Sequence, residues 1–194
     1  FPSEELRVAN AQLRHLSQTD ELTGLHNRRG FDECLLQELR SAQRDQTPLT
    51  LILCDIDYFK AFNDSLGHVQ GDACLQRIGA ILRSVCLRPR DQAARYGGEE
   101  FTLVLPHTPK SGAMTYARGL QAVLRQAAIH HPGSPFDAKV TLSGGITTCV
   151  PDAAATCESL ILRADEALYA AKALGRNRFF SFEMQADTTG QSAV

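Results

Sequence analysis

Apolar and polar positions alternate along the chain with two different periods, and these periods predict its elements. Apolar residues spaced three and four apart predict helices, whereas a short continuous apolar run between polar residues predicts a strand buried on both faces. We expect helices over 6–16, 28–43, 72–87, 110–130 and 157–174, and strands over 49–56, 140–148, 179–182 and on both sides of Gly97 and Gly98. A loop rich in Asn, Asp, Gly and His joins the first strand to the helix that starts at residue 72.

The order of these elements is strand, helix, strand–turn–strand, helix, strand. This order predicts an α+β sandwich of the ferredoxin-like class with a central antiparallel sheet. The palms of nucleic-acid polymerases and the nucleotidyl cyclases have related layouts, in which carboxylates on the central strands hold magnesium. The fold class by itself implies no particular chemistry.

The length of the chain bounds its organisation. With 194 residues, 43% of them hydrophobic, it is long enough for one buried core and too short for two comfortable domains. We expect a linker or signalling helix within 1–18, one domain over 19–182 and a flexible polar tail over 183–194. The first helix has a heptad-like spacing that suits pairing with its copy or folding back on the domain equally well. Because the chain begins at Phe1, we also expect an upstream sensory domain in the complete protein.

Charge and cysteine content exclude several function classes. The chain has 20 basic and 22 acidic residues, a net charge of −2. We therefore expect no binding to nucleic-acid polymers and no polybasic attachment to a membrane surface. We expect neither a membrane span nor a signal peptide. The six cysteines contain no CxxC pair, which is typical of buried, reduced thiols in a cytoplasmic protein. A membrane anchor elsewhere in the complete protein would leave this domain on the cytoplasmic side.

The run Arg95–Phe101 sets two glycines directly before two carboxylates and an apolar strand. Gly97 and Gly98 tolerate the positive φ angles of a tight hairpin turn. Glu99 and Glu100 are therefore expected where the second strand of the hairpin begins. A solvated acidic hairpin tip has the same local pattern, so the turn alone does not decide between the two interpretations.

Two further carboxylates are expected at the same edge of the sheet. Asp55 and Asp57 end the first strand, and in an antiparallel sheet the turn with Glu99 and Glu100 lies beside that end. Two like charges about 4 Å apart repel by about 4 kcal/mol at an effective dielectric of about 20, so such a cluster requires a cation or protons. Ligand sets made only of oxygen favour Mg²⁺ or Mn²⁺ over zinc. Such ions usually accompany a nucleoside triphosphate.

Several side chains are suited to hold that nucleotide. Lys60 follows the acidic strand end, and Lys172 and Arg176 close the last helix, although each alone is more typical of a solvated surface charge. Amide and carboxylate oxygens able to read a base edge follow the first strand at Asn63, Asp64, His68 and Asp72. The helix dipole gives Asp72 an alternative role at the start of a helix.

Five short segments carry a resemblance to a known family. They are Asp20–Leu25 with Asn27–Arg29, Asp55–Lys60 with Asn63 and Asp64, Gly67 and His68 with Gly71, Asp72 and Leu75, Arg95–Phe101, and Ala164–Asn177. Together they resemble a GGDEF domain, the diguanylate cyclase family, in its GGEEF form. The resemblance covers about residues 19–182.

This resemblance implies condensation of two GTP molecules into cyclic di-GMP with release of two pyrophosphates. Each subunit of a homodimer would present one GTP to the other. Asp55, the Ile56 carbonyl and Glu99 would hold Mg²⁺ or Mn²⁺. Glu100 would be a further ligand or assist deprotonation of the attacking 3′ hydroxyl, and the sequence does not divide these roles between the two glutamates. Lys60 would stabilise charge on the transferred phosphoryl group.

The resemblance also implies the residues that bind the nucleotide. Lys172 and Arg176 would grip the β and γ phosphates. Asn63 and Asp72 would read the guanine edge and favour GTP over ATP, because adenine lacks the N1 and N2 donors that pair with a carboxylate. The remaining substrate-binding positions are Phe59, His68, Leu75, Gly97 and Gly98.

Arg88 and Asp91 form an RxxD pair at the spacing of the family's inhibitory site for cyclic di-GMP. A simple ion pair at a helix end has the same spacing. A catalytically silent cyclic di-GMP receptor is the rival function, whereas a polymerase-like or mononucleotide cyclase palm would not require the RxxD pair. His26 and Tyr58 depart from the family's pattern, and we expect neither to touch the catalytic residues.

Overall fold

The computed structural model describes residues 3–182, with the backbone alone at residues 14–16. The predicted tail over 183–194 and the first two residues lie outside this range. The elements in chain order are α1 (Glu4–Leu16), α2 (Arg28–Asp45), β1 (Leu49–Ile56), α3 (Phe59–Leu66), α4 (His68–Val85), β2 (Gln92–Gly97), β3 (Glu100–Pro106), α5 (Lys110–Ala127), β4 (Leu142–Cys149), α6 (Cys157–Ala173) and β5 (Phe179–Phe180).

The five strands form one sheet in the order β2-β3-β1-β4-β5, which places β1 at its centre. β1 pairs antiparallel with β3 and β4, and β3 pairs antiparallel with β2. β5 runs parallel to β4 at the edge. The α+β class is confirmed, but the sheet is mixed rather than wholly antiparallel, because α6 is a crossover that returns the chain to the start of β4.

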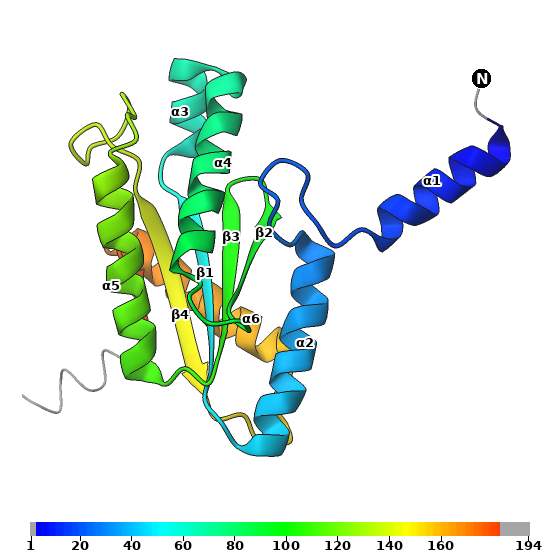
Figure 1. Ribbon diagram of the computed structural model, residues 1–194. Helices are drawn as coiled ribbons and strands as arrows, with labels where there is room; N and C mark the ends of the chain where they lie inside the picture. Colours follow the sequence, from blue (N-terminus) through cyan, green and yellow to red (C-terminus); the bar gives the residue numbers. More distant parts are fainter. Residues whose placement is uncertain (1–2, 183–194) are drawn as a thin grey trace, which may run out of the picture.

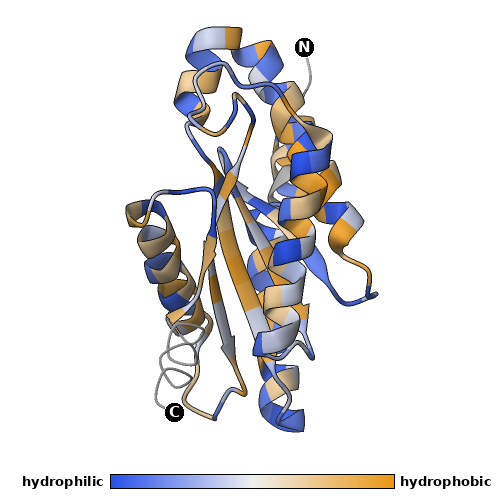
Figure 2. Ribbon diagram, turned by 90° about the vertical axis from the view of Figure 1, so that its left-hand side faces the viewer, coloured by the Kyte–Doolittle hydropathy of each residue, from blue (hydrophilic) through white to orange (hydrophobic). Residues whose placement is uncertain are grey.

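Helices cover both faces of the sheet (Figure 1). Successive side chains of β1 point to opposite faces. Leu51 and Leu53 join the core cluster with α2 and α6, whereas Ile52 and Cys54 join the cluster with α3, α4 and α5. Figure 2 shows hydrophobic residues concentrated along the strands between these layers. The same alternation carries Asp55 to the face covered by α6.

The segment expected as a loop after β1 is the helix α3, and α4 begins at His68, four residues before the predicted start. The two helices meet at Gly67, whose φ of 85° allows the tight reversal between them. Phe59 and Phe62 are buried and anchor α3 to the core. Phe59, Phe62 and Leu66 do stand three and four residues apart, but over only eight residues rich in Asn, Asp and Ser this spacing is too short a signal, so the predicted loop is wrong.

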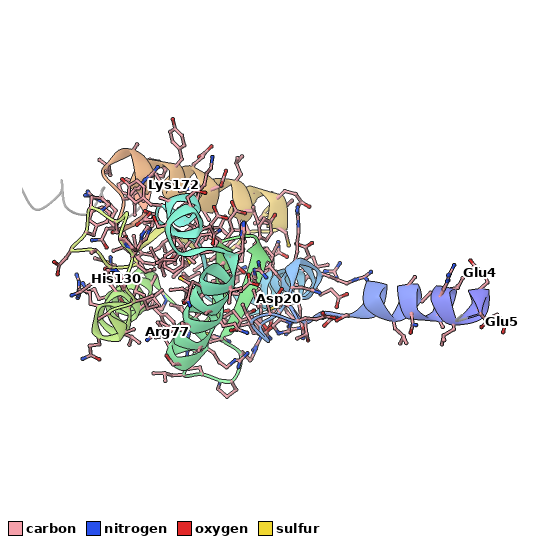
Figure 3. The ribbon with its side chains drawn as sticks, turned by 90° about the horizontal axis from the view of Figure 1, so that it is seen from above. Glu4, Glu5, Asp20, Arg77, His130 and Lys172 are labelled. Atoms are coloured by element: carbon pink, nitrogen blue, oxygen red, sulfur yellow. The ribbon has the colours of Figure 1, made fainter. Side chains whose placement is uncertain are left out.

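Helix α1 projects away from the domain, with Glu4 and Glu5 at its far end (Figures 1 and 3). Leu6 and Leu13 are 50% and 64% exposed on it. The structure therefore does not fold α1 back onto the domain, and pairing with a second copy stays a prediction. None of the helices within residues 3–182 is both long and apolar enough to cross a membrane.

All six cysteines lie within the described residues, and none of them forms a disulfide. Cys34, Cys54 and Cys74 are buried, and burial raises the pKa of the Cys74 thiol to about 11. The other three, Cys86, Cys149 and Cys157, are only partly buried. The prediction of buried thiols is therefore wrong for these three, which lie at the ends of α4, β4 and α6.

Candidate active site

The turn at Gly97 and Gly98 lies beside the end of β1, as predicted. Asp55 is opposite Glu100 in the register of β1 and β3. The Ile56 N–H donates to the Glu99 carbonyl oxygen at 3.3 Å, which ties the turn directly to the last residue of β1. The two acidic segments, more than forty residues apart in sequence, therefore meet at one edge of the sheet.

The N-terminal segment before α2 holds this turn from the side. Arg95 Nε donates to the Gly98 carbonyl at 2.8 Å, and its Nη1 lies 3.2 Å from Asp20 Oδ1. The other carboxylate oxygen of Asp20 accepts bonds from the backbone N–H and the hydroxyl of Thr23 at 2.9 and 2.7 Å. The position of the turn thus depends on a network that begins four residues after α1.

Asp55 is a buried carboxylate with an incompletely compensated charge. It is 6% exposed, and Lys172 Nζ, from the last turn of α6, donates to its Oδ2. Burial raises the pKa of Asp55, the Lys172 ammonium opposes that rise, and the charges of Asp57 and Glu99 add to it. Glu99 is therefore one of the charges that act on the Asp55 carboxylate at this edge.

Asp57 has different surroundings, although the same face of the strand carries it. Its Oδ1 accepts from the Ser143 hydroxyl at 2.6 Å. Its Oδ2 accepts from the Thr141 hydroxyl at 2.7 Å and from the Asn177 N–H at 3.0 Å. These donors satisfy the carboxylate, which links β1 to the start of β4 and to the loop after α6. Asp57 is therefore a structural residue. It is not part of the acidic edge, which consists of Asp55, Glu99 and the Ile56 backbone.

The two glutamates of the turn, Glu99 and Glu100, also differ in burial and surroundings. Glu99 is half-buried next to Asp55, whereas Glu100 is exposed and lines the open groove between α2 and α6. Within residues 3–182 no group of three or more His, Cys, Asp or Glu side chains is arranged to hold a metal ion. The expected cluster of three or four carboxylates is therefore not arranged as one metal site; Asp55 and the backbone of Ile56 lie next to the turn that carries Glu99.

This smaller set still fits Mg²⁺ or Mn²⁺. The donors are oxygens alone, and Mg²⁺ is usually bound by one or two carboxylates together with substrate phosphates and water. The raised pKa of Asp55 shows that its charge lacks full compensation from the protein. A divalent ion carried by a triphosphate would supply that compensation.

Asn63 and Gly71 meet where α3 and α4 pack together. The Asn63 Oδ1 is buried and has no hydrogen-bond partner among the described residues. A Cβ at Gly71 would lie only 1.9 Å from that oxygen, so glycine is required there for Asn63 to keep its place. An unsatisfied buried amide is costly, and it is a common feature of sites that await a ligand.

The other predicted nucleotide-binding residues lie at different depths. Lys60, His68 and Asp72 are exposed in the first turns of α3 and α4. Phe59 and Leu75 are 9% and 3% exposed and belong to the core between these helices. These two apolar residues therefore pack beneath the exposed polar side chains of α3 and α4 and do not form an open binding face.

Arg176, which the sequence assigns to phosphate binding, lies in the loop after α6 and contacts Tyr58. The expectation that Tyr58 touches none of the catalytic residues stays a prediction. The Arg176 Cζ atom lies 5.1 Å from the centroid of the Tyr58 ring. Both residues have left-handed backbone angles, with φ of 64° at Arg176 and 56° at Tyr58. Two tight turns far apart in sequence bring them together, and no local pattern predicts such a contact.

The RxxD pair is an ion pair with several additional acceptors. Arg88 Nη2 lies 3.1 Å from Asp91 Oδ1 and donates to the Pro106 carbonyl at 2.8 Å, and Nη1 donates to the His107 carbonyl at 3.2 Å. The Tyr116 hydroxyl donates to Asp91 Oδ2 at 3.1 Å. The Arg88 side chain nevertheless remains 47% exposed. Both sequence interpretations of this pair are compatible with that arrangement.

This pair is far from the acidic edge. Pro106, which accepts from Arg88, is opposite Leu49 at the start of β1, whereas Asp55 lies near the end of that strand. Six residues of extended strand separate Leu49 from Asp55, a distance of about 20 Å. Any ligand at Arg88 would therefore act on the acidic edge from the opposite end of the sheet.

Comparisons with known proteins agree with this geometry. The family model described as "Diguanylate cyclase, GGDEF domain" matches residues 17–178. The chain is 36% identical over 176 residues to Diguanylate cyclase A of Treponema denticola, covering 89% of this chain and 46% of that protein. It is 41% identical over 165 residues to Diguanylate cyclase DgcP of Pseudomonas aeruginosa, covering 85% of this chain and 24% of that protein. The chain thus spans less than half the length of these two curated relatives.

A solved structure has the same fold over nearly the whole chain. The coiled coil and GGDEF domain of DgcB from Caulobacter crescentus, in complex with c-di-GMP, superposes with a TM-score of 0.77 at 33% identity. The match covers 92% of each chain.

Proposed function

The chain belongs to the GGDEF domain family of diguanylate cyclases, and we propose that in its GGEEF form it condenses two GTP molecules into cyclic di-GMP and two pyrophosphates. The observation that supports this proposal is the pairing of the end of β1, which carries Asp55, with the turn that carries Glu99. Relatives named as diguanylate cyclases, 36% and 41% identical over most of this chain, support it.

Asp55, the Ile56 carbonyl and Glu99 are proposed to hold Mg²⁺ or Mn²⁺. When bound, the ion would neutralise the triphosphate and lower the pKa of the attacking 3′ hydroxyl. Glu100, exposed beside this set, is proposed to receive the hydroxyl proton. Lys60, in the first turn of α3, is proposed to stabilise charge on the transferred phosphoryl group.

Lys172 has two proposed partners. Without nucleotide it compensates the charge of Asp55. With the metal ion on Asp55, its ammonium is released to bind the β and γ phosphates together with Arg176. The same lysine thereby keeps the acidic edge stable before substrate arrives and contributes to substrate binding afterwards.

Guanine recognition is proposed for Asn63 and Asp72, with His68 beside the nucleotide. The unpartnered Asn63 Oδ1 supports a role in ligand binding. Gly97 and Gly98 keep the turn free of side chains that would block the phosphates. Phe59 and Leu75 hold α3 and α4 in register beneath the base.

A homodimer is proposed as the active unit, because one edge offers one set of carboxylates and therefore one GTP. Facing subunits would supply proximity of the 3′ hydroxyl of one nucleotide to the α phosphate of the other. Pairing of α1 with its copy, and an upstream sensory domain, would set that geometry.

Arg88 and Asp91 are proposed as the inhibitory site for cyclic di-GMP. Occupation would require the Arg88 guanidinium to exchange at least one of its carbonyl acceptors for a guanine or a phosphate. Calorimetry with cyclic di-GMP is expected to show binding to the parent protein and a loss of at least about tenfold in affinity for Arg88→Ala, since a bidentate charged contact is removed. Equal affinity of both proteins would contradict this site.

The proposed activity is tested by incubating demonstrably dimeric, ligand-free protein with GTP and Mg²⁺. Chromatography is expected to show cyclic di-GMP and pyrophosphate, and Glu99→Ala is expected to make none while it retains the parent circular dichroism spectrum. A dimer that binds cyclic di-GMP but forms none would establish the receptor function instead.

A further inference from the structure

Tyr58 occupies the junction between β1 and α3, and its ring lies between two segments that are distant in sequence. On one side it meets Arg176 from the loop after α6, at 5.1 Å from Cζ to the ring centroid. On the other it meets the ring of Phe136, from the loop between α5 and β4, at 6.4 Å between centroids. The Tyr58 side chain is 40% exposed, so the contact forms at the surface of the site.

The loop between α5 and β4 also fixes the backbone of Tyr58. His131 is fully buried, and its Nε2 lies 3.0 Å from the Tyr58 carbonyl oxygen. Its Nδ1 accepts the Gly133 N–H at 3.2 Å, which requires the neutral tautomer with the proton on Nε2. The His131 ring packs edge-on against Phe62 of α3 at 5.2 Å. Tyr58 is thus held in its left-handed conformation by a buried, satisfied group.

Arg176 is restrained at its backbone as well as at its side chain. The next residue, Asn177, donates its N–H to Asp57 Oδ2 at 3.0 Å, and both residues have positive φ. A guanidinium on a flexible side chain loses much of its rotamer freedom when it binds a phosphate. A ring that already holds the guanidinium removes part of that loss before the nucleotide arrives.

We propose that Tyr58 is a positioning residue, which holds the Arg176 guanidinium in place for the β and γ phosphates of bound GTP. The inference rests on the proposed function, because it assigns the triphosphate to Arg176. It further requires that the ring, rather than the hydroxyl, carries the effect. Tyr58 should therefore contribute to affinity for a triphosphate and not for the guanine base.

The test compares Tyr58→Leu with the matched control Tyr58→Phe. Binding of a non-hydrolysable GTP analogue and of GMP is measured with Mg²⁺ by calorimetry. Tyr58→Leu is expected to bind the analogue about fivefold more weakly, the size of a surface cation–π contact, and Tyr58→Phe to stay within about twofold of the parent. GMP, which lacks the β and γ phosphates, is expected to bind all three proteins equally. Tyr58→Met serves the same purpose if Tyr58→Leu does not fold.

A double-mutant cycle with Arg176→Ala separates positioning from a general structural effect. In the Arg176→Ala background, Tyr58→Leu is expected to cause no further loss of affinity for the GTP analogue. An unchanged affinity in Tyr58→Leu, an equal loss for GMP, or an additive loss in the double variant would each overturn the proposal. Failure of the parent protein to bind the GTP analogue would instead contradict the proposed function.

Discussion

Asp55 and Asp57 lie two residues apart at the end of one strand, and their surroundings are opposite. Asp57 accepts three hydrogen bonds from protein donors, two of them hydroxyls at the start of β4. Asp55 has the Lys172 ammonium, and burial raises its pKa despite that partner. One carboxylate is therefore part of the scaffold, whereas the other has charge available for a ligand. Identical residue type and face do not make the two equivalent.

The largest expected effect is a loss of enzymatic activity when Asp55 is changed. Asp55→Asn is expected to lower the rate of cyclic di-GMP formation by at least about 1000-fold, because an amide is a poor ligand for Mg²⁺. Its free energy of unfolding is expected to stay within about 1 kcal/mol of the parent, since the lost ion pair is offset by removal of a buried charge. Product formation and urea unfolding measure the two quantities. If the Asp55→Asn protein were active, the proposed difference between a functional Asp55 and a structural Asp57 would be contradicted.

The corresponding change at Asp57 is expected to lower the stability of the fold. Asp57→Ala leaves two hydroxyls and one backbone N–H without their acceptor, and we expect the free energy of unfolding to fall by about 3 kcal/mol. Denaturant unfolding followed by circular dichroism measures this loss. Asp57→Asn, which keeps the shape and one acceptor oxygen, serves as the control and is expected to lose less. Unchanged stability of Asp57→Ala would show that its bonds are not structural.

Lys172 provides a second test of the role of Asp55, because its ammonium compensates the Asp55 charge in the absence of ligand. Lys172→Met is expected to weaken binding of a GTP analogue by about tenfold, as one phosphate-binding charge is lost. Calorimetry in Mg²⁺ gives the affinity. Lys139→Met is the matched control, since Lys139 pairs with the exposed Asp137 in the loop after α5. Equal effects of the two variants would mean that net charge alone is responsible.

The smallest expected effect is on the KM for GTP when the space beside Asn63 is filled. Gly71→Ala forces the Asn63 amide to move, and we expect the KM for GTP to rise about fivefold with little change in kcat, since ground-state binding is affected. Gly119→Ala, in the interior of α5 with nothing within 4 Å of its new Cβ, is the control. It is expected to leave KM unchanged and to raise the free energy of unfolding by about 0.5 kcal/mol. Steady-state kinetics with GTP would settle the matter, and an unchanged KM in Gly71→Ala would argue against a role for Asn63.

Much of the fold follows from local pattern. The continuous apolar run of β1 predicts a central strand, and the helical spacings locate α2, α5 and α6 within a few residues of their observed bounds. The pattern fails at α3, which is only eight residues long and is stabilised by the packing of Phe59, Phe62 and Leu66 on the core. It also gives no indication that β5 is parallel, because two residues carry no register information.

The site was predictable only where strand pairing determines it. An antiparallel hairpin next to β1 brings Glu99 to the end of that strand, and the pairing of Asp55 with Glu100 confirms this geometry. The structural role of Asp57 depends on Thr141, 84 residues away, which no local period can indicate. The contact of Tyr58 with Arg176 is hidden for the same reason.

A crystal structure of the dimer with Mg²⁺ and a non-hydrolysable GTP analogue would decide whether Asp55 and Glu99 share one ion. We predict an ion with a carboxylate oxygen of each residue at about 2.1 Å and with triphosphate oxygens in the remaining positions. Lys172 is expected to have moved from Asp55 to the β or γ phosphate. An ion that contacts only one of the two carboxylates, or a Lys172 that remains on Asp55 beside bound nucleotide, would contradict the account.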